Sequence, residues 1–200
     1  IFFKRATEKT IAKASAFLSV SKFLGDAVNK FALPKQYQII PNVVNTELFY
    51  FNESANKTFR FIHVSNMVLL KNVESILQAA YQLHKSGCSF ELILIGNKDD
   101  AYPAYAQKLG LPADAVKFLG EIPYKNVAGE LQKSNSFIIN CKTETFCCAA
   151  AEALCCGLPV IAADAGALPE LVNDENGILI MTDKIEELTK KKKKMIDDYA

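Results

Sequence analysis

Short apolar runs alternate with amphipathic stretches along this chain. Eight runs are typical of β-strands, and they cover residues 16–20, 37–40, 59–64, 90–95, 116–119, 137–139, 160–162 and 178–180. The clearest helix has apolar residues at spacings of three and four from Val73 to Leu83, and it should end by Gly87. Strands this apolar are covered on both sides. The alternation therefore predicts an α/β fold, a Rossmann-like parallel sheet with helices on both faces.

The same pattern divides the chain. Residues 42–57 are rich in Asn and other turn-forming residues, which is typical of an interdomain linker. Residues 1–41 hold only about two strands and two helices, too few to bury a core of their own. We expect residues 1–41 to be the tail of an N-terminal domain or a strap, and residues 58–200 to be the α/β domain itself.

Composition narrows the class of protein. The 23 basic and 22 acidic residues give a net charge of +1, which argues against a nucleic-acid-binding surface. No apolar run is long enough to span a membrane, and charged residues follow the first three residues at once, unlike in a signal peptide. We therefore expect a cytoplasmic protein.

The chain contains six cysteines, which are Cys88, Cys141, Cys147, Cys148, Cys155 and Cys156. Four of them form two adjacent pairs on one predicted helix, a spacing that does not match a zinc site. The simpler interpretation is reduced, buried thiols, because free cysteine often serves as a small core residue. A reactive or metal-binding role is the alternative.

Two carboxylates stand out in the small, apolar segment from residue 144 to 170. Glu152 lies among alanines on a predicted helix, and burying a carboxylate without a partner costs several kcal/mol. We therefore expect a ligand to satisfy it. Glu144 follows the sixth predicted strand, so both carboxylates should face the crevice at the strand ends, where open α/β sheets bind ligands.

Other candidate residues also follow the ends of predicted strands. Lys71 is predicted at the start of a helix, where it could neutralise a phosphate. Thr145 and Phe146 are predicted to open the next helix, with free amides toward the crevice. Gly96 and Gly166 would let a ligand approach the backbone closely.

Some residues allow two interpretations. Glu170 is either a first-turn helix acid or a ligand-binding residue. His63 and His84 have no serine or cysteine motif nearby, which favours packing or surface positions. The lysine run at residues 190–194 predicts a solvated helix face or a fraying helix end, and contact with anionic membrane lipid is the alternative.

The two glutamates carry a resemblance to a known family. Glu144 and Glu152, separated by seven residues and continued by EALCCGLPVIAADAGALPELV, resemble the signature of retaining GT-B glycosyltransferases of family 4, within the glycosyl transferases group 1. ASAFLSVSKFLGDAV, IIPNVVNTELF and VKFLGEIPYKNVAGELQKSNSFI resemble the end of that family's N-terminal domain, its interdomain segment and the stretch before the glutamates. The resemblance covers about residues 14 to 183 and implies the C-terminal, donor-binding half of a GT-B fold.

The resemblance implies roles for the charged residues. Glu152 would bind the ribose of a nucleotide-diphosphate sugar, since a vicinal diol offers two donors to one carboxylate. Glu144 would be the catalytic residue beside the donor sugar. Lys71 would hold the diphosphate, joined by the amides of Phe146 and Cys147.

The resemblance also implies a base site and catalysis without a metal. Backbone around Gly96 and Ile122 would frame the base, and Gly166 would lie in a further donor-binding loop. Fixed charges and helix amides would stabilise the leaving diphosphate in place of a metal, which suits the lack of an Asp-x-Asp motif. No cofactor is expected.

The chain departs from the family's pattern at several positions. Asn66 stands where the family usually has an arginine, and replacing a charge-assisted bond by a neutral one costs about 1 kcal/mol. Cys147 and Ala167 replace customary glycines, and Val43 and Asn45 alter the interdomain turn.

The implied function is transfer of a hexose from a nucleotide-diphosphate sugar to a glycan or lipid-linked acceptor. The family builds its acceptor site on an N-terminal domain of comparable size. Residues 1–41 are long enough for only the tail of such a domain. We therefore expect the chain alone to bind a nucleotide sugar and to transfer little. A non-catalytic nucleotide-binding domain, favoured by Asn66, and a sugar-nucleotide epimerase are the alternatives.

Overall fold

A computed structural model describes residues 2–32, 34–53, 58–97, 100–182 and 184–197 of the chain. Strands lie at or within two residues of all eight predicted runs, which confirms the α/β prediction. The first two strands, β1 (Leu18–Ser19) and β2 (Gln38–Ile39), pair in parallel as a small separate sheet.

The other strands form one six-stranded parallel sheet. They are β3 (Arg60–Val64), β4 (Glu91–Ile95), β5 (Val116–Gly120), β6 (Ser136–Ile139), β7 (Val160–Ala163) and β8 (Gly177–Ile180). Their spatial order is β5-β4-β3-β6-β7-β8. The order therefore reverses between β3 and β6, and the crevice at their carboxyl ends is where such sheets bind ligands.

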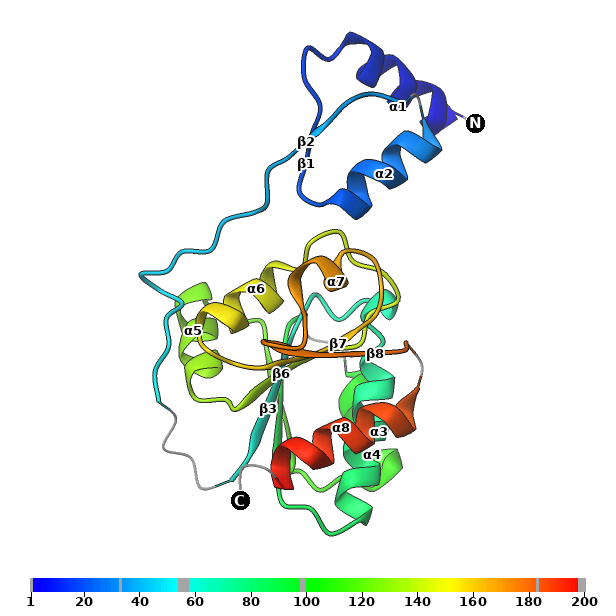
Figure 1. The fold of residues 1–200 in the computed structure, drawn as a ribbon. Helices are drawn as coiled ribbons and strands as arrows, with labels where there is room; N and C mark the ends of the chain where they lie inside the picture. The colour runs from blue at the N-terminus through cyan, green and yellow to red at the C-terminus, as the bar shows by residue number, and fades with distance from the viewer. Residues whose placement is uncertain (1, 33, 54–57, 98–99, 183, 198–200) are drawn as a thin grey trace.

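Helices cover both faces of this sheet (Figure 1). They are α3 (Val73–Lys85), α4 (Ala101–Leu109), α5 (Tyr124–Gln132), α6 (Cys148–Cys155), α7 (Leu168–Leu171) and α8 (Ile185–Asp197). Because side chains alternate along a strand, Phe61 packs with the cluster of α3, α4 and α8, whereas Ile62 packs with that of α5, α6 and α7. Strands β3, β4, β6 and β7 are thus buried on both sides, as their apolar runs predict. The edge strand β5 differs, because its Lys117 and Leu119 are exposed.

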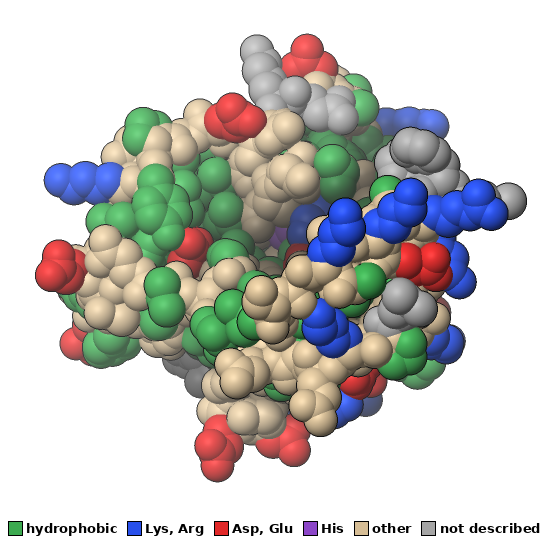
Figure 2. Space-filling view, turned by 90° about the horizontal axis from the view of Figure 1, so that it is seen from above, with side chains coloured by type: hydrophobic (Ala, Val, Ile, Leu, Met, Phe, Trp, Pro, Cys, Tyr) green, Lys and Arg blue, Asp and Glu red, His purple; other side chains and the backbone are tan. Residues whose placement is uncertain are grey.

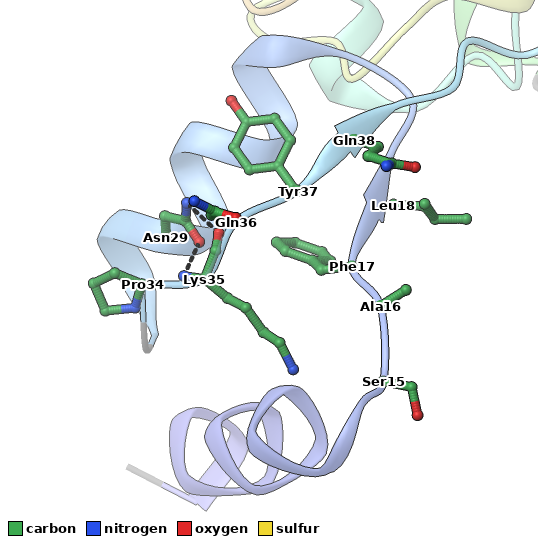
Figure 3. Close-up of a pocket in the computed structure, with 10 residues that line it drawn as sticks. All are labelled: Ser15, Ala16, Phe17, Leu18, Asn29, Pro34, Lys35, Gln36, Tyr37 and Gln38. Atoms are coloured by element: carbon green, nitrogen blue, oxygen red, sulfur yellow. Dashed lines mark hydrogen bonds between the residues drawn. The ribbon is translucent and has the colours of Figure 1, made fainter.

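The N-terminal unit, residues 2–41, adds α1 (Phe2–Lys13) and α2 (Lys22–Phe31) to β1 and β2. Figure 2 views the molecule from above, the end at which this unit lies in Figure 1. The surface has a hollow near the centre of this view, with apolar side chains on one wall and Lys and Arg side chains on the opposite wall. A separate open hollow of about 1070 Å³ lies within the unit, lined by residues 15–18, 29 and 34–38 (Figure 3). There the Lys35 ammonium reaches the carbonyls of Ile11 and Ala14 at the end of α1.

The segment after β2 is fastened to the large domain. Residues 42–53 contain neither helix nor strand, yet Phe49 is fully buried in the core. The Gln132 side-chain amide donates to the carbonyls of Leu48 and Tyr50, each at 3.3 Å. Residues 54–57 of the predicted linker lie outside the described residues, and the division into domains stays a prediction.

The lysine run lies on α8, and one of its members is not solvated. Lys192 is fully buried, with its ammonium 4.9 Å from the ring centroid of Phe61 and 5.9 Å from that of Phe90. The prediction of a single solvated face is therefore wrong, because the helical period turns the third lysine of the run toward the sheet. Among the described helices, none combines the length and apolar character that a membrane crossing requires.

Candidate functional site

The loop after β3 carries Lys71 to the crevice. Leu69 to Lys71 form one turn of 3-10 helix, and Asn72 then adopts a left-handed conformation with φ 50°. The prediction that Lys71 opens a helix is thus wrong by two residues, because Asn72 separates its turn from α3 at Val73.

A buried histidine supports this loop. His63 Nδ1 donates to the carbonyl of Ile138 at 2.8 Å, and its Nε2 accepts from the Ser65 hydroxyl at 2.8 Å. Burial lowers the pKa of His63 to about 4, so the ring is neutral. Ser65 Oγ in turn accepts from the Met67 amide at 3.0 Å. These contacts confirm the packing role predicted for His63.

Lys71 and Glu144 form an ion pair between the ends of β3 and β6. The Lys71 ammonium lies 2.5 Å from a Glu144 carboxylate oxygen, and both side chains are largely buried, at 18% and 14% exposure. Burial alone would lower the pKa of Lys71, but the hydrogen bond and charge of Glu144 outweigh it and raise the pKa above its ordinary value. Lys71 is therefore a fixed positive charge at the switch point of the sheet.

The loop after β7 holds the backbone of Glu144. The Ala167 amide donates to the Glu144 carbonyl at 2.9 Å. Gly166 has φ +64°, and a Cβ built there would lie 2.2 Å from the same carbonyl oxygen. Only glycine fits this close approach, so Gly166 supports the site from behind.

Helix α6 begins later than predicted. Thr145 and Phe146 lie in the loop, Cys147 has φ 72°, and the helix starts at Cys148. The left-handed turn at Cys147 explains why the family's pattern has glycine there, since few other residues adopt it without strain. The backbone of residues 145–147 is thus an irregular loop that leads into the helix.

These residues line a hollow of about 220 Å³ at the strand ends. Its walls come from Asn42, Val64, Ser65, Asn66, Lys71, Glu144, Thr145, Phe146, Cys147, Cys148 and Ala149. The structure therefore brings together predicted site residues from the loops after β3 and β6. Asn66 is exposed at its edge.

A second hollow of about 350 Å³ lies at the ends of β4 and β5. Gly96 lines it together with Met67, Tyr102 and Phe118. An open hollow lined by residues 66–70, 97, 100 and 102 shares Asn66 with the first and Met67 with the second, so it lies next to both. Ile122 lies outside these hollows, half-buried against the core under α5 and α6.

Glu152 has an intramolecular partner that sequence reasoning missed. The Tyr124 hydroxyl donates to Glu152 Oε1 at 2.5 Å, and Glu152 is 8% exposed. Burial raises the pKa of Glu152, which the bond from Tyr124 partly offsets. Burial also raises the pKa of Tyr124 to about 12. The two residues are 28 positions apart in sequence, and only their packing at α5 and α6 joins them.

Three of the six cysteines are buried as predicted, namely Cys141, Cys147 and Cys156. Burial raises the pKa of Cys147 to about 12, so its thiol keeps its proton at neutral pH. The prediction is wrong for Cys148, which is exposed and accepts a hydrogen bond from the Asn42 side chain at 3.4 Å. Cys148 is the first residue of α6, and there the helix meets the crevice.

Comparison with known proteins supplies a family. A family model described as "Glycosyl transferases group 1" matches residues 44–200. A component of the phosphatidylinositol N-acetylglucosaminyltransferase of Arabidopsis thaliana is 25% identical over 154 residues, which is 75% of this chain and 34% of that protein. The chain thus spans about a third of that relative's length.

Solved structures share the fold. The sucrose-phosphate synthase of Thermosynechococcus elongatus superposes with a TM-score of 0.86 at 22% identity, over 98% of this chain and 51% of that one. HepE of Anabaena, in complex with UDP and glucose, superposes with a TM-score of 0.83 at 22% identity, over 99% and 57%. The predicted fold, half of a GT-B architecture, is confirmed by these superpositions.

Proposed function

Because this chain belongs to the group 1 glycosyl transferases, whose model matches residues 44–200, we propose that it is the donor-binding part of a retaining, family 4 enzyme. The proposed reaction moves a hexose from a UDP or GDP sugar to a glycan or lipid-linked acceptor, in polysaccharide or glycolipid synthesis. The observation that carries the proposal is the Lys71–Glu144 ion pair at the switch point of the sheet.

In the proposed complex, the donor diphosphate competes with Glu144 for Lys71. The ammonium is a fixed cation in a crevice of low dielectric, where it stabilises a developing diphosphate charge more strongly than in water. Asn66 and the amides of Phe146 and Cys147 line the same hollow and would donate to phosphate oxygens. Glu144, released from Lys71, would act as the catalytic residue beside the donor sugar.

Glu152 is proposed to bind the ribose. Its burial raises its pKa, so the carboxylate gains from every hydrogen bond that a ligand donates to it. Tyr124 satisfies one oxygen, and a ribose diol would reach the other or replace the tyrosine. Glu152 lies four residues after Cys148 on α6, and positions four apart share a helix face, so this site would adjoin the hollow that holds the diphosphate.

The hollow beside Gly96 is proposed to hold the base. Its volume of about 350 Å³ lies within the range of small-molecule pockets, and Tyr102 and Phe118 offer aromatic walls to a planar ring. Ile122 is not among the residues that line this hollow, so the base site is proposed without it.

The acceptor is proposed to bind on a further domain. The chain spans 34% of the Arabidopsis relative and about half of the matched structures, so a preceding domain that residues 2–41 continue would face the crevice. The name of that relative includes phosphatidylinositol, which supports a lipid-linked substrate. Val68, Leu69 and Leu70 are exposed at the mouth of the crevice, where an apolar acceptor could pack.

Neither a cofactor nor a metal is proposed, because Lys71 and backbone amides would supply the positive charge.

We further propose a cytoplasmic location with peripheral contact at the inner membrane face. Lys190, Lys193 and Lys194 are exposed on α8 and could meet anionic lipid there. Vesicle sedimentation tests the contact, since equal binding to neutral and anionic vesicles contradicts it.

The donor site is tested by calorimetric titration of the chain with UDP and with GDP. One nucleotide should bind, and Glu152→Ala should weaken it by about tenfold or more, because a ribose-binding carboxylate is lost. Glu175→Ala is the matched control, since Glu175 is exposed in the turn after α7. If neither nucleotide binds the unmodified chain, the proposed function is wrong.

A non-catalytic nucleotide-binding domain is the second candidate, and the neutral, exposed Asn66 in the phosphate hollow favours it. The two candidate functions predict different results for the variant Asn66→Arg. If the site is catalytic, the added charge should tighten UDP or GDP binding and raise hydrolysis of the nucleotide sugar in the presence of the preceding domain. Tighter binding without any turnover would favour the non-catalytic domain.

A further inference from the structure

Glu170 joins two parts of the chain that are far apart in sequence. It lies on α7, and its two carboxylate oxygens accept from the backbone amides of Lys22 at 2.8 Å and Phe23 at 2.7 Å. These are the first two amides of α2. The third free amide, that of Leu24, donates to the hydroxyl oxygen of Ser21 at 3.1 Å. Helix α2 is therefore capped partly by its own residue and partly by the large domain.

The bonds to Glu170 position more than the first turn of α2, because α2 is itself packed against the residue that precedes the strand β2. Gly25 of α2 packs so closely on Tyr37 that a Cβ there would lie 2.4 Å from its ring. The Tyr37 hydroxyl donates to Asp26 at 2.6 Å, and Tyr37 directly precedes β2. Because α2 is fastened to β2 in this way, a bond to its first turn positions both.

The other side of the contact leads to the donor site. Glu170 follows the loop whose Ala167 amide donates to the Glu144 carbonyl at 2.9 Å. Leu168, between the two contacts, is fully buried and fixes the short helix to the core. The path from α2 to Glu144 thus runs through a short anchored segment, from Glu170 through Leu168 to Ala167.

We propose that Glu170 is a positioning residue: it clasps the N-terminal unit over the crevice and holds the loop that supports Glu144. The clasp is a carboxylate at the positive end of a helix, where charge and hydrogen bonds act together. Its effect on donor binding rests on the proposed function, whereas the clasp itself does not. Opening it frees the N-terminal unit and loosens Glu144, so contacts to the donor sugar should weaken more than contacts to the nucleotide.

Amide hydrogen exchange, followed by NMR on the full chain, tests the clasp without any ligand. Glu170→Ala should speed exchange at Lys22 and Phe23 about fivefold or more, in line with the loss of a helix cap. Glu170→Gln, which keeps an acceptor and loses the charge, should give a smaller increase. Glu175→Ala is the control and should change neither amide. Unchanged exchange in Glu170→Ala would overturn the clasp.

Ligand titration tests the positioning role. With UDP-glucose as the probe, or GDP-mannose if GDP is the nucleotide that binds, Glu170→Ala should lower affinity about fivefold and leave the affinity for the free nucleotide within about twofold. Equal losses for both ligands, or none, would overturn positioning and leave a purely structural cap. If the unmodified chain binds no nucleotide, the proposed function fails, while the exchange result still decides the clasp.

A double-mutant cycle tests whether Glu170 acts on UDP-glucose binding through its bonds from the backbone amides of α2. Lys22→Pro removes one donor at a helix position that tolerates proline, and Lys22→Ala removes only the side chain. Lys22→Pro should weaken UDP-glucose binding in the unmodified chain and have little further effect in Glu170→Ala. Lys22→Ala should have the same small effect in both backgrounds. Additive losses for Lys22→Pro and Glu170→Ala would contradict a direct clasp.

Discussion

Lys71 and Glu144 neutralise each other in a crevice that would otherwise hold an isolated charge. Each is mostly buried, and neither would be stable there as an ion without the other or a ligand. The pair can therefore act as an exchange site, in which an incoming anion takes the lysine and releases the carboxylate.

The exchange predicts opposite effects for the two residues. Lys71→Met should weaken UDP or GDP binding by about tenfold or more, because a charge-assisted contact to the diphosphate is lost. Glu144→Gln should leave that affinity equal or raise it, because Lys71 no longer has a competing anion. Calorimetric titration measures both, and a parallel loss in the two variants would contradict the exchange.

Gly166 tests how closely the loops of the site approach. Gly166→Ala should lower the free energy of unfolding by about 2 kcal/mol or more, because its Cβ would meet the Glu144 carbonyl at 2.2 Å in a left-handed conformation. Gly110 has φ +86° with open space around it. Gly110→Ala is therefore the control for backbone strain alone and should cost only about 1 kcal/mol in urea denaturation.

At the scale of elements, α8 packs against the sheet with a buried lysine, Lys192, which lowers the stability of the fold. Among the described side chains, the Lys192 ammonium is one of the few buried polar groups with no hydrogen-bond partner, and two phenylalanine rings face it. Burial lowers the pKa of Lys192 to about 7. The helix thus holds against α3 and the sheet by its apolar residues, in spite of this lysine.

Lys192→Met should stabilise the protein. In the unfolded chain Lys192 keeps its proton up to its ordinary pKa of 10.5, whereas the folded chain releases it above about pH 7. The stability of the unmodified protein should therefore rise as the pH increases from 7 to 10.5. Methionine removes this dependence and should add about 2 kcal/mol at pH 7, measured by urea denaturation. Lys193→Met, at an exposed position, should change stability by less than about 0.5 kcal/mol.

At the scale of the whole molecule, His63 makes unfolding sensitive to acid. Its pKa is about 4 in the folded chain, against an ordinary value of 6.5. The unfolded chain therefore binds a proton that the folded chain refuses between these values, and stability is lost as the pH falls from 6.5 toward 4. The loss should be about 3 kcal/mol.

His63→Gln isolates this contribution. The variant loses hydrogen bonds and should be less stable at every pH, but its stability should fall less steeply between pH 6.5 and 4. The exposed His84 provides the control, since His84→Gln should keep the slope of the unmodified protein. Denaturant midpoints across this pH range give the slopes, and equal slopes in all three proteins would show that His63 titrates normally.

The sequence predicts the sheet well and the starts of helices less well. Apolar runs mark β3, β4, β6 and β7 because these strands are buried on both faces. The apolar pattern gives the start of α3 at Val73, but Lys71 lies before it in a separate turn and α6 begins at Cys148, later than expected. The reason is that Asn72 and Cys147 adopt left-handed conformations, which asparagine favours but cysteine does not. In the candidate site, Lys71 and Glu144 could be found because they follow strand ends.

The sequence by itself determined that Lys71 and Glu144 reach the crevice, since strand ends of a parallel sheet lie at one edge and the hydrophobic pattern locates those ends. Only the tertiary structure decided their partners: Lys71 with Glu144, Tyr124 with Glu152, and Glu170 with the first turn of α2. These contacts join residues 28 to 148 positions apart. A charged side chain needs a partner wherever it is buried, but which partner it finds depends on how the elements pack.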